Sequence, residues 1–270
     1  ISLLINTIFA SYLPSGSVSW LYYADRLMEF PSGLLGAALG TILLPSLAKC
    51  HTDARHEEFS ILLDWGLRLT LLLTLPAALA LFLLGVPLVA TLFQHGAFTA
   101  TDVLETRNAL TAYCIGLSGL ILVKVLAPGF YARQNIRTPV KIALLTLAVT
   151  QLLNLLFIFG FQLAHAGLAL SISLASCLNA ALLYRGLRRN GTYQPRAGWW
   201  IFIGKLLLAL IALGSVLWFG TGAERDWLEM SLSLKGLRLA ALCLAGALTY
   251  FATLALLGFR LKDFKKRGAN

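Results

Sequence analysis

The feature that most constrains this chain is a set of long apolar runs without a single charged residue. The clearest runs cover residues 69–94, 142–164 and 239–259. A helix needs about 20 apolar residues to cross the hydrocarbon core of a bilayer, which is about 30 Å thick. Each run meets that length, so the three runs predict membrane-spanning helices.

The alternative is a large soluble helical core. Helices of that kind carry a polar face at helical spacing, whereas these runs are apolar on all sides. Hydrophobic residues make up 58% of the chain and charged residues 13%, which lies outside the range of soluble domains. We therefore expect lipid to be the solvent for most of the chain.

The expected fold class is all-α, a polytopic bundle of transmembrane helices. A partial helix over residues 1–13 is closed by a turn at residues 14–16, and seven complete crossings follow. The first crossing is too long for a simple span, and we expect Pro31 to break it. The chain begins within an apolar helix and has no initiator Met, so we expect it to be a piece of a longer protein. The crossings are expected at residues 18–48, 65–93, 108–132, 139–161, 166–187, 199–220 and 234–259.

The distribution of Lys and Arg predicts the orientation, because short cytoplasmic loops are enriched in these residues. Alternate connections are strongly basic, and the connections between them carry few basic residues beside several acidic ones. This pattern predicts that the basic connections and the basic C-terminal tail are cytoplasmic. The basic set is Lys49, Arg55, Arg133, Arg137, Lys141, Arg185, Arg188, Arg189, Arg196, Arg260, Lys262, Lys265, Lys266 and Arg267. Tryptophans at positions 199, 200, 218 and 227 bracket one crossing, as interfacial anchors do.

Three ionisable residues fall within the first complete crossing. A charge near the bilayer centre costs at least about 2.5–3.5 kcal/mol, so such residues normally face a cavity or a partner. Tyr22, Arg26 and Glu29 share one stripe of a helix, and Asp25 lies beside it. We interpret this stripe as the wall of a polar, hydrated cavity. The alternative is that Arg26 and Glu29 form an internal ion pair that only holds the bundle together.

Further along, Lys124 stands inside an apolar segment, four residues before Pro128. It either lines the same cavity or extends to a membrane interface. Gln151 and Asn154 are uncharged, and hydrogen bonds between helices are expected for both. The spacing of Gly36 and Gly40 allows close contact between helices.

Signatures of enzymes and metal sites are missing from the sequence. It contains no phosphate-binding loop and no G-x-S-x-G motif, and the stretch HEEFS lacks the second His of a zinc motif. The formal charge of +10 comes mainly from residues beside hydrophobic ends, without the pattern of nucleic-acid binding. We expect no enzymatic activity, no cofactor, no metal site and no nucleic-acid partner.

Two long motifs carry a resemblance to a known family. Residues 20–49, WLYYADRLMEFPSGLLGAALGTILLPSLAK, and residues 123–141, VKVLAPGFYARQNIRTPVK, resemble the MurJ/MviN family of bacterial lipid II flippases. With the order of crossings, the resemblance covers essentially the whole chain. It implies the second lobe, or C-terminal half, of a two-lobe, fourteen-helix transporter of the multidrug/oligosaccharidyl-lipid/polysaccharide superfamily, in the bacterial inner membrane.

The resemblance also implies a function and a site. The family moves lipid II, the undecaprenyl-diphosphate-linked precursor of peptidoglycan, from the cytoplasmic to the periplasmic leaflet by alternating access. Residues 1–197 would form the second-lobe bundle, with residues 17–48 as the helix that lines the central cavity. Residues 198–270 would supply two helices that form a groove for the lipid tail, followed by the basic cytoplasmic tail. The implied partners are lipid II, membrane lipids and the N-terminal lobe of the same protein.

The implied substrate-binding residues are Arg26, Asp25, Glu29, Tyr22 and Lys124. Sodium coupling is not supported, because the crossing that holds Asn154 has no carboxylate. Two rival functions stay open on the sequence, an exporter of drugs or polysaccharide-linked lipids in the same superfamily and a membrane enzyme acting on polyprenyl lipids.

Overall fold

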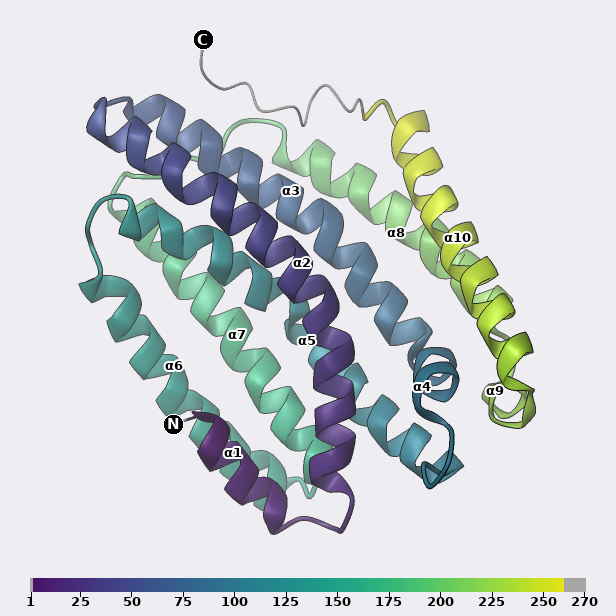
Figure 1. Ribbon diagram of the computed structural model, residues 1–270. Helices are drawn as coiled ribbons and strands as arrows, with labels where there is room; N and C mark the ends of the chain where they lie inside the picture. Colours follow the sequence, from purple (N-terminus) through teal and green to yellow (C-terminus); the bar gives the residue numbers. More distant parts are fainter. Residues whose placement is uncertain (1, 260–270) are drawn as a thin grey trace.

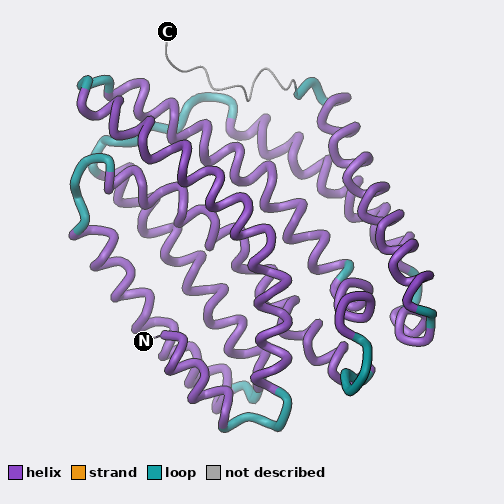
Figure 2. Tube along the Cα trace, viewed as in Figure 1, coloured by secondary structure: helices purple, strands orange, loops and turns teal. Residues whose placement is uncertain are grey.

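The computed structural model describes residues 2–259, and the basic tail over residues 260–270 lies outside the described residues. Within the described range the chain consists of helices and loops and contains no strand (Figure 2). The helices are α1 (Ser2–Ser11), α2 (Ser17–Thr52), α3 (His56–Leu83), α4 (Gly85–Phe93), α5 (Ala100–Tyr131), α6 (Arg137–Leu155), a π-helical turn η1 (Leu156–Gly160), α7 (Ala164–Arg189), α8 (Trp199–Thr221), α9 (Glu224–Glu229) and α10 (Leu232–Leu256).

Seven of the described helices are long and apolar enough to cross a membrane, with α6 and η1 together forming one of them. This confirms the seven predicted crossings after a partial helix. Several helices begin earlier than predicted, because hydropathy marks the apolar span while the helix continues into its polar first turn. The start of α5 is an example, since Thr99 and Asp102 form a reciprocal capping box ahead of the apolar stretch.

Two predicted boundaries are wrong. The helix α2 is continuous past Pro31 and Pro45, and Figure 1 shows it bending part-way along instead of breaking. In an apolar environment a broken helix would leave several backbone groups unpaired, so the chain tolerates the one bond lost at each proline. The predicted crossing at residues 65–93 is two helices, α3 and α4, separated at Leu84. Pro87 lies in the first turn of α4, where its missing N–H does no harm.

The central helix of the bundle is α5. Of its most apolar stretch 61% is buried, against 22% to 44% for the other candidate spans in the described range. Small residues let α7 pack closely on α5, where the Cα of Gly116 faces the backbone of Ser173 and Gly119 faces Cys177. On another side of α5 lies α2, with α3 beside it (Figure 1).

The last long helices, α8 and α10, pack on each other and on α3. A hydrogen bond of 2.6 Å from the Tyr250 hydroxyl of α10 to the Leu72 carbonyl of α3 joins them to the rest. One continuous cluster of buried apolar side chains runs from α2 to α10. The division of the chain at residues 197 and 198 stays a prediction.

The connections lie at two opposite ends of the bundle. Figure 1 shows the α2–α3, α5–α6 and α7–α8 connections and the end of α10 at one end, and these three connections with the helix ends beside them hold the predicted cytoplasmic residues that fall within the described range. Trp200 and Trp218 are exposed, as interfacial anchors would be. Trp227 is fully buried and donates a hydrogen bond to the Thr221 carbonyl at 2.8 Å, so the anchoring role predicted for it is wrong.

Candidate functional site

The predicted polar stripe lies on one exposed face of α2. Arg26 and Glu29 form an ion pair of 2.8 Å, with 56% and 59% of their side chains exposed. The Arg26 guanidinium lies 4.9 Å from the centre of the Tyr22 ring, and Asp25 is also exposed. The structure therefore brings these residues together as the sequence predicted. Within the described residues no other element covers this face, so the chain supplies one wall for these groups and no enclosure.

Lys124 of α5 reaches the same helix. Its Nζ donates a hydrogen bond of 2.9 Å to the carbonyl oxygen of Ser32. The side chain passes directly over Gly36, where an added Cβ would lie 2.3 Å from the Lys124 Cδ. The contact predicted from the glycine spacing is thereby confirmed at Gly36. The ammonium lies near the middle of α2, one turn beyond Glu29, which places it beside the stripe.

The start of α2 is fixed to the start of α5. The Trp20 Nε1 donates to Asp102 Oδ1 at 2.7 Å, and the Trp20 ring lies against the ring of His165 from α7, with centroids 5.0 Å apart. The polar stripe begins two residues after Trp20. This anchor therefore holds the direction in which the stripe faces.

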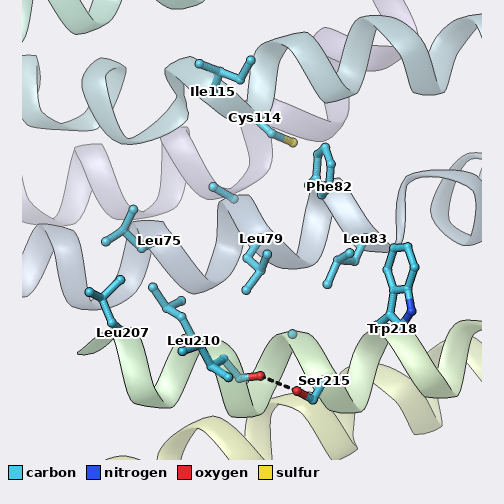
Figure 3. Close-up of a pocket in the computed structure, with 13 residues that line it drawn as sticks. Leu75, Leu79, Phe82, Leu83, Cys114, Ile115, Leu207, Leu210, Ser215 and Trp218 are labelled. Atoms are coloured by element: carbon cyan, nitrogen blue, oxygen red, sulfur yellow. Dashed lines mark hydrogen bonds between the residues drawn. The ribbon is translucent and has the colours of Figure 1, made fainter. Parts of the chain in front are cut away.

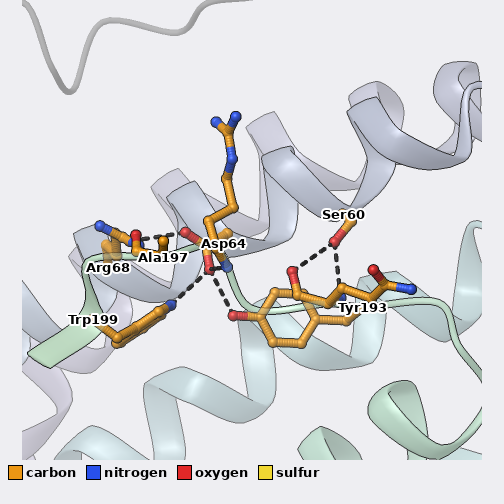
Figure 4. A network of polar contacts seen from close by, with 8 residues as sticks. Ser60, Asp64, Arg68, Tyr193, Ala197 and Trp199 are labelled. Atoms are coloured by element: carbon orange, nitrogen blue, oxygen red, sulfur yellow. Dashed lines mark hydrogen bonds and ion pairs between the residues drawn. The ribbon is translucent and has the colours of Figure 1, made fainter.

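A second polar cluster was not predicted from the sequence. Asp64 of α3 is 3% exposed, and its carboxylate accepts hydrogen bonds from Arg68, Tyr193, Trp199 and the backbone N–H of Arg196 (Figure 4). Burial and the bond to this carboxylate raise the pKa of Tyr193, so its hydroxyl remains a donor. The spacing of Asp64 and Arg68, one helical turn apart, was the signal in the sequence.

The uncharged polar residues of α6 form a third cluster. Asn154 is fully buried, and its Nδ2 donates to Asn6 Oδ1 of α1 at 3.0 Å and to Gln151 Oε1 at 3.2 Å. This confirms the hydrogen bond between helices predicted for Asn154. The bond described for Gln151 joins it to Asn154 within α6, so the prediction for Gln151 is not confirmed. All three side chains are amides.

An apolar pocket of about 600 Å³ is lined by residues of α3, α5 and α8. Figure 3 shows Leu75, Leu79 and Leu83 of α3 on the side that faces α8, which contributes Leu207, Leu210 and Trp218, while Phe82 lies beside Cys114 of α5. The predicted lipid groove involved α8 and α10. Among the described residues, those lining this pocket come from α3, α5 and α8.

Seven candidate spans define a multi-pass helical membrane protein, and its bundle leaves one charged face of α2 open. The family model described as "Lipid II flippase MurJ" matches residues 1–237. The chain therefore belongs to the MurJ family.

Relatives and solved structures agree with this assignment. The chain is 52% identical to the lipid II flippase MurJ of Burkholderia cenocepacia over 270 residues, covering 99% of this chain and 52% of that protein. It is 42% identical to the probable lipid II flippase MurJ of Vibrio cholerae, covering 98% of this chain and 50% of that protein. The chain spans about half the length of the curated relatives it matches.

A solved structure of lipid II flippase MurJ in an inward closed conformation matches with a TM-score of 0.77 at 25% identity, covering 95% of this chain and 50% of that chain. A eukaryotic MATE transporter, AtDTX14, matches with a TM-score of 0.51 at 14% identity, covering 95% of this chain and 64% of that chain, and shows the fold alone.

Proposed function

We propose that this chain is the C-terminal lobe of a bacterial lipid II flippase, which carries the lipid-linked peptidoglycan precursor from the cytoplasmic to the periplasmic leaflet by alternating access. Membership of the MurJ family supports the substrate. The observation that carries the proposal is the exposed ion pair on α2, because the chain leaves this charged face uncovered. A second lobe opposite α2 would enclose it as a hydrated cavity.

In this proposal the protein is a transporter without enzymatic activity, and it lies in the inner membrane with its C-terminus in the cytoplasm. The excess of Lys and Arg at one end of the bundle supports the orientation. The second lobe is the N-terminal half of the same protein. The relatives are about twice as long as this chain, which supports that assignment.

The proposed substrate contacts are Arg26, Asp25, Glu29, Tyr22 and Lys124. A guanidinium presents five N–H donors in a planar fork, and a fork of this kind binds two oxygens of a phosphate at once. The ion pair with Glu29 engages Nη1 of Arg26, so a diphosphate would compete with the carboxylate for this group. Asp25 and Glu29 carry two negative charges against the single positive charge of Arg26. Lys124 adds a second positive charge and makes the formal charge of the site zero. Further cations for the diphosphate would come from the other lobe.

The hydrocarbon tail would lie along the last two long helices. The apolar pocket beside α8 supports an apolar path next to this helix. Contact of the tail with α8 and α10 keeps the apolar chain in lipid surroundings while the polar headgroup crosses in the cavity.

The test uses a full-length chimera, in which this chain replaces the matching half of the Burkholderia cenocepacia relative. We expect the chimera to restore growth of a strain depleted of its own lipid II flippase. Arg26→Ala should abolish growth at unchanged membrane abundance, measured by immunoblot, and Arg26→Lys should restore it in part at best. Arg55→Ala is the matched control, because Arg55 also pairs with a glutamate three residues later, Glu58, but at the end of the bundle.

The double variant Arg26→Ala with Glu29→Ala separates substrate recognition from packing. If the pair only holds the bundle together, removing both charges is tolerated better than removing one, since a lone charge is the costly state. Growth restored by the double variant would remove Arg26 from the substrate site. A chimera that inserts at normal abundance and supports no growth would refute the proposed function.

A further inference from the structure

The strongest polar cluster outside the α2 stripe is centred on the buried carboxylate of Asp64. Asp64 Oδ2 accepts from Arg68 Nε at 2.8 Å, and Asp64 Oδ1 accepts from the Tyr193 hydroxyl at 2.7 Å and from Trp199 Nε1 at 2.8 Å. The backbone N–H of Arg196 donates to the same Oδ1 at 3.3 Å. A buried carboxylate is costly unless hydrogen bonds and an opposite charge compensate it, and here both are present.

The donors show what this cluster joins. Arg68 lies on α3, like Asp64. Tyr193 and Arg196 lie in the connection between α7 and α8, and Trp199 is the first residue of α8. None of these residues is among the proposed substrate contacts. The cluster therefore fastens the beginning of α8 to the first half of α3.

Other contacts strengthen the same junction. The Arg68 guanidinium lies 5.0 Å from the centre of the Trp199 ring, and its Nη2 donates to the Ala197 carbonyl at 3.2 Å (Figure 4). Ser60, one turn before Asp64, donates to the Gln194 carbonyl and accepts from the Gln194 N–H. The contacts follow α3 for two turns and thereby fix the direction of the connection as well as its position.

The two helices that meet at Asp64 are also the two long walls of the apolar pocket. On α3 the wall begins at Leu75, and on α8 it begins at Leu207, eight residues after Trp199. The walls contact each other further along, where the position of a Cβ on Gly214 lies 3.5 Å from Leu79 Cδ2. Because both walls extend from one polar junction, a change in the angle at Asp64 changes the width of the pocket along its length.

We infer that Asp64 is a positioning residue, which fixes α8 against α3 and so sets the spacing of the apolar walls beside which the lipid tail moves during flipping. The part that concerns transport rests on the proposed function. Asp64 acts through Tyr193, Trp199 and Arg68, and it does not contact the substrate. The hydrogen bonds at one carboxylate are directional, whereas apolar contact between α3 and α8 is not, so the hydrogen bonds define the angle between the helices more sharply.

The test measures the spacing of the walls directly. Nitroxide labels are attached at Phe82→Cys on α3 and Ile211→Cys on α8, two exposed residues that line the pocket, in the full-length chimera with its native cysteines replaced by alanine. Dipolar broadening of the electron paramagnetic resonance spectrum then reports the spacing in membranes. We expect Asp64→Ala to weaken the broadening. The matched control is Glu58→Ala, which removes another α3 carboxylate and should leave the spectrum unchanged.

The measurement separates positioning from simple stability, because the spectra are compared only among variants that accumulate in the membrane. Where Asp64→Ala does not accumulate, the double variant Tyr193→Phe with Trp199→Phe replaces it, since it removes two donors and keeps the carboxylate with Arg68. An unchanged spectrum in whichever variant accumulates overturns the inference. A weakened broadening supports the positioning of α8.

Growth of the flippase-depleted strain tests the transport part. We expect Asp64→Ala, or the double variant, to lower complementation several-fold, with Glu58→Ala unchanged. An altered spectrum with full growth would overturn the role of Asp64 in transport. Failure of the unmutated chimera to complement refutes the proposed function instead, and the spectrum, which needs no lipid II, still decides whether Asp64 positions α8.

Discussion

Replacing Gly116 by alanine tests the close packing of α5 on α7. A Cβ at this position would lie 2.3 Å from the Cα of Ser173, 2.6 Å from its Cβ and 2.8 Å from its Oγ. The closest atom belongs to the backbone, so no side-chain rotation relieves the overlap. The two helices must move apart by about 1 Å before the atoms reach ordinary van der Waals distance.

The cost follows from three contributions. Overpacking of this kind costs about 1–3 kcal/mol. The separation also stretches the hydrogen bond of 2.7 Å from Ser173 Oγ to the Ala112 carbonyl, and losing such a bond costs about 1 kcal/mol. The higher helix propensity of alanine offsets about 0.5–1 kcal/mol. We therefore expect a net destabilisation of about 1–3.5 kcal/mol.

The assay heats the detergent-solubilised chimera and measures the fraction that stays monodisperse in size-exclusion chromatography. Gly116→Ala should lower the apparent melting temperature. Gly204→Ala on α8 is the control, because no atom lies within 4 Å of its Cβ position, and its melting temperature should be unchanged or slightly raised. A Gly116→Ala protein that melts at or above the parent temperature would show that α5 and α7 are not in close contact as described.

Two further predictions concern the candidate site and the orientation. Gly36→Ala should displace the side chain of Lys124, because the added Cβ would lie 2.3 Å from the Lys124 Cδ. It should therefore reduce complementation as Lys124→Ala does, with membrane abundance retained. Gly40→Ala should have no effect, because the nearest atom to its added Cβ is a backbone oxygen at 3.9 Å. Equal growth of both glycine variants would contradict a role for the Lys124 position. Single cysteines within residues 185–196 should be shielded from impermeant thiol reagents added outside the cell, and those within residues 224–229 should react. The reverse labelling would overturn the orientation.

Much of the fold was predictable because the thickness of a bilayer sets the length of each helix that crosses it. The length of an apolar run determines a crossing, and the seven crossings were predicted from such runs, three of which contain a stretch of this length without any charge. The stripe of Tyr22, Arg26 and Glu29 was predictable for a similar reason, since residues three and four apart share one face of any helix.

The errors fell where a local pattern competes with its surroundings. Pro31 would break a helix in water, but the lack of other hydrogen-bond partners keeps α2 continuous. Trp227 has the composition of an interfacial anchor, but the short helix α9 turns it inward onto Thr221. The break at Leu84 between α3 and α4 was not predicted either, because a break of one residue barely changes the mean hydropathy of residues 65–93.

The sequence by itself determined the membrane crossings, the basic and less basic ends of the bundle and the polar face of α2, because these depend on helical periodicity and on the cost of a charge in lipid. Only the tertiary structure decided that Lys124 reaches Ser32, and that Asp64 joins residues more than 120 positions later in the chain. Such contacts depend on which faces of distant helices meet. That choice is made by the packing of small residues such as Gly36 and Gly116, which no property of a single helix specifies.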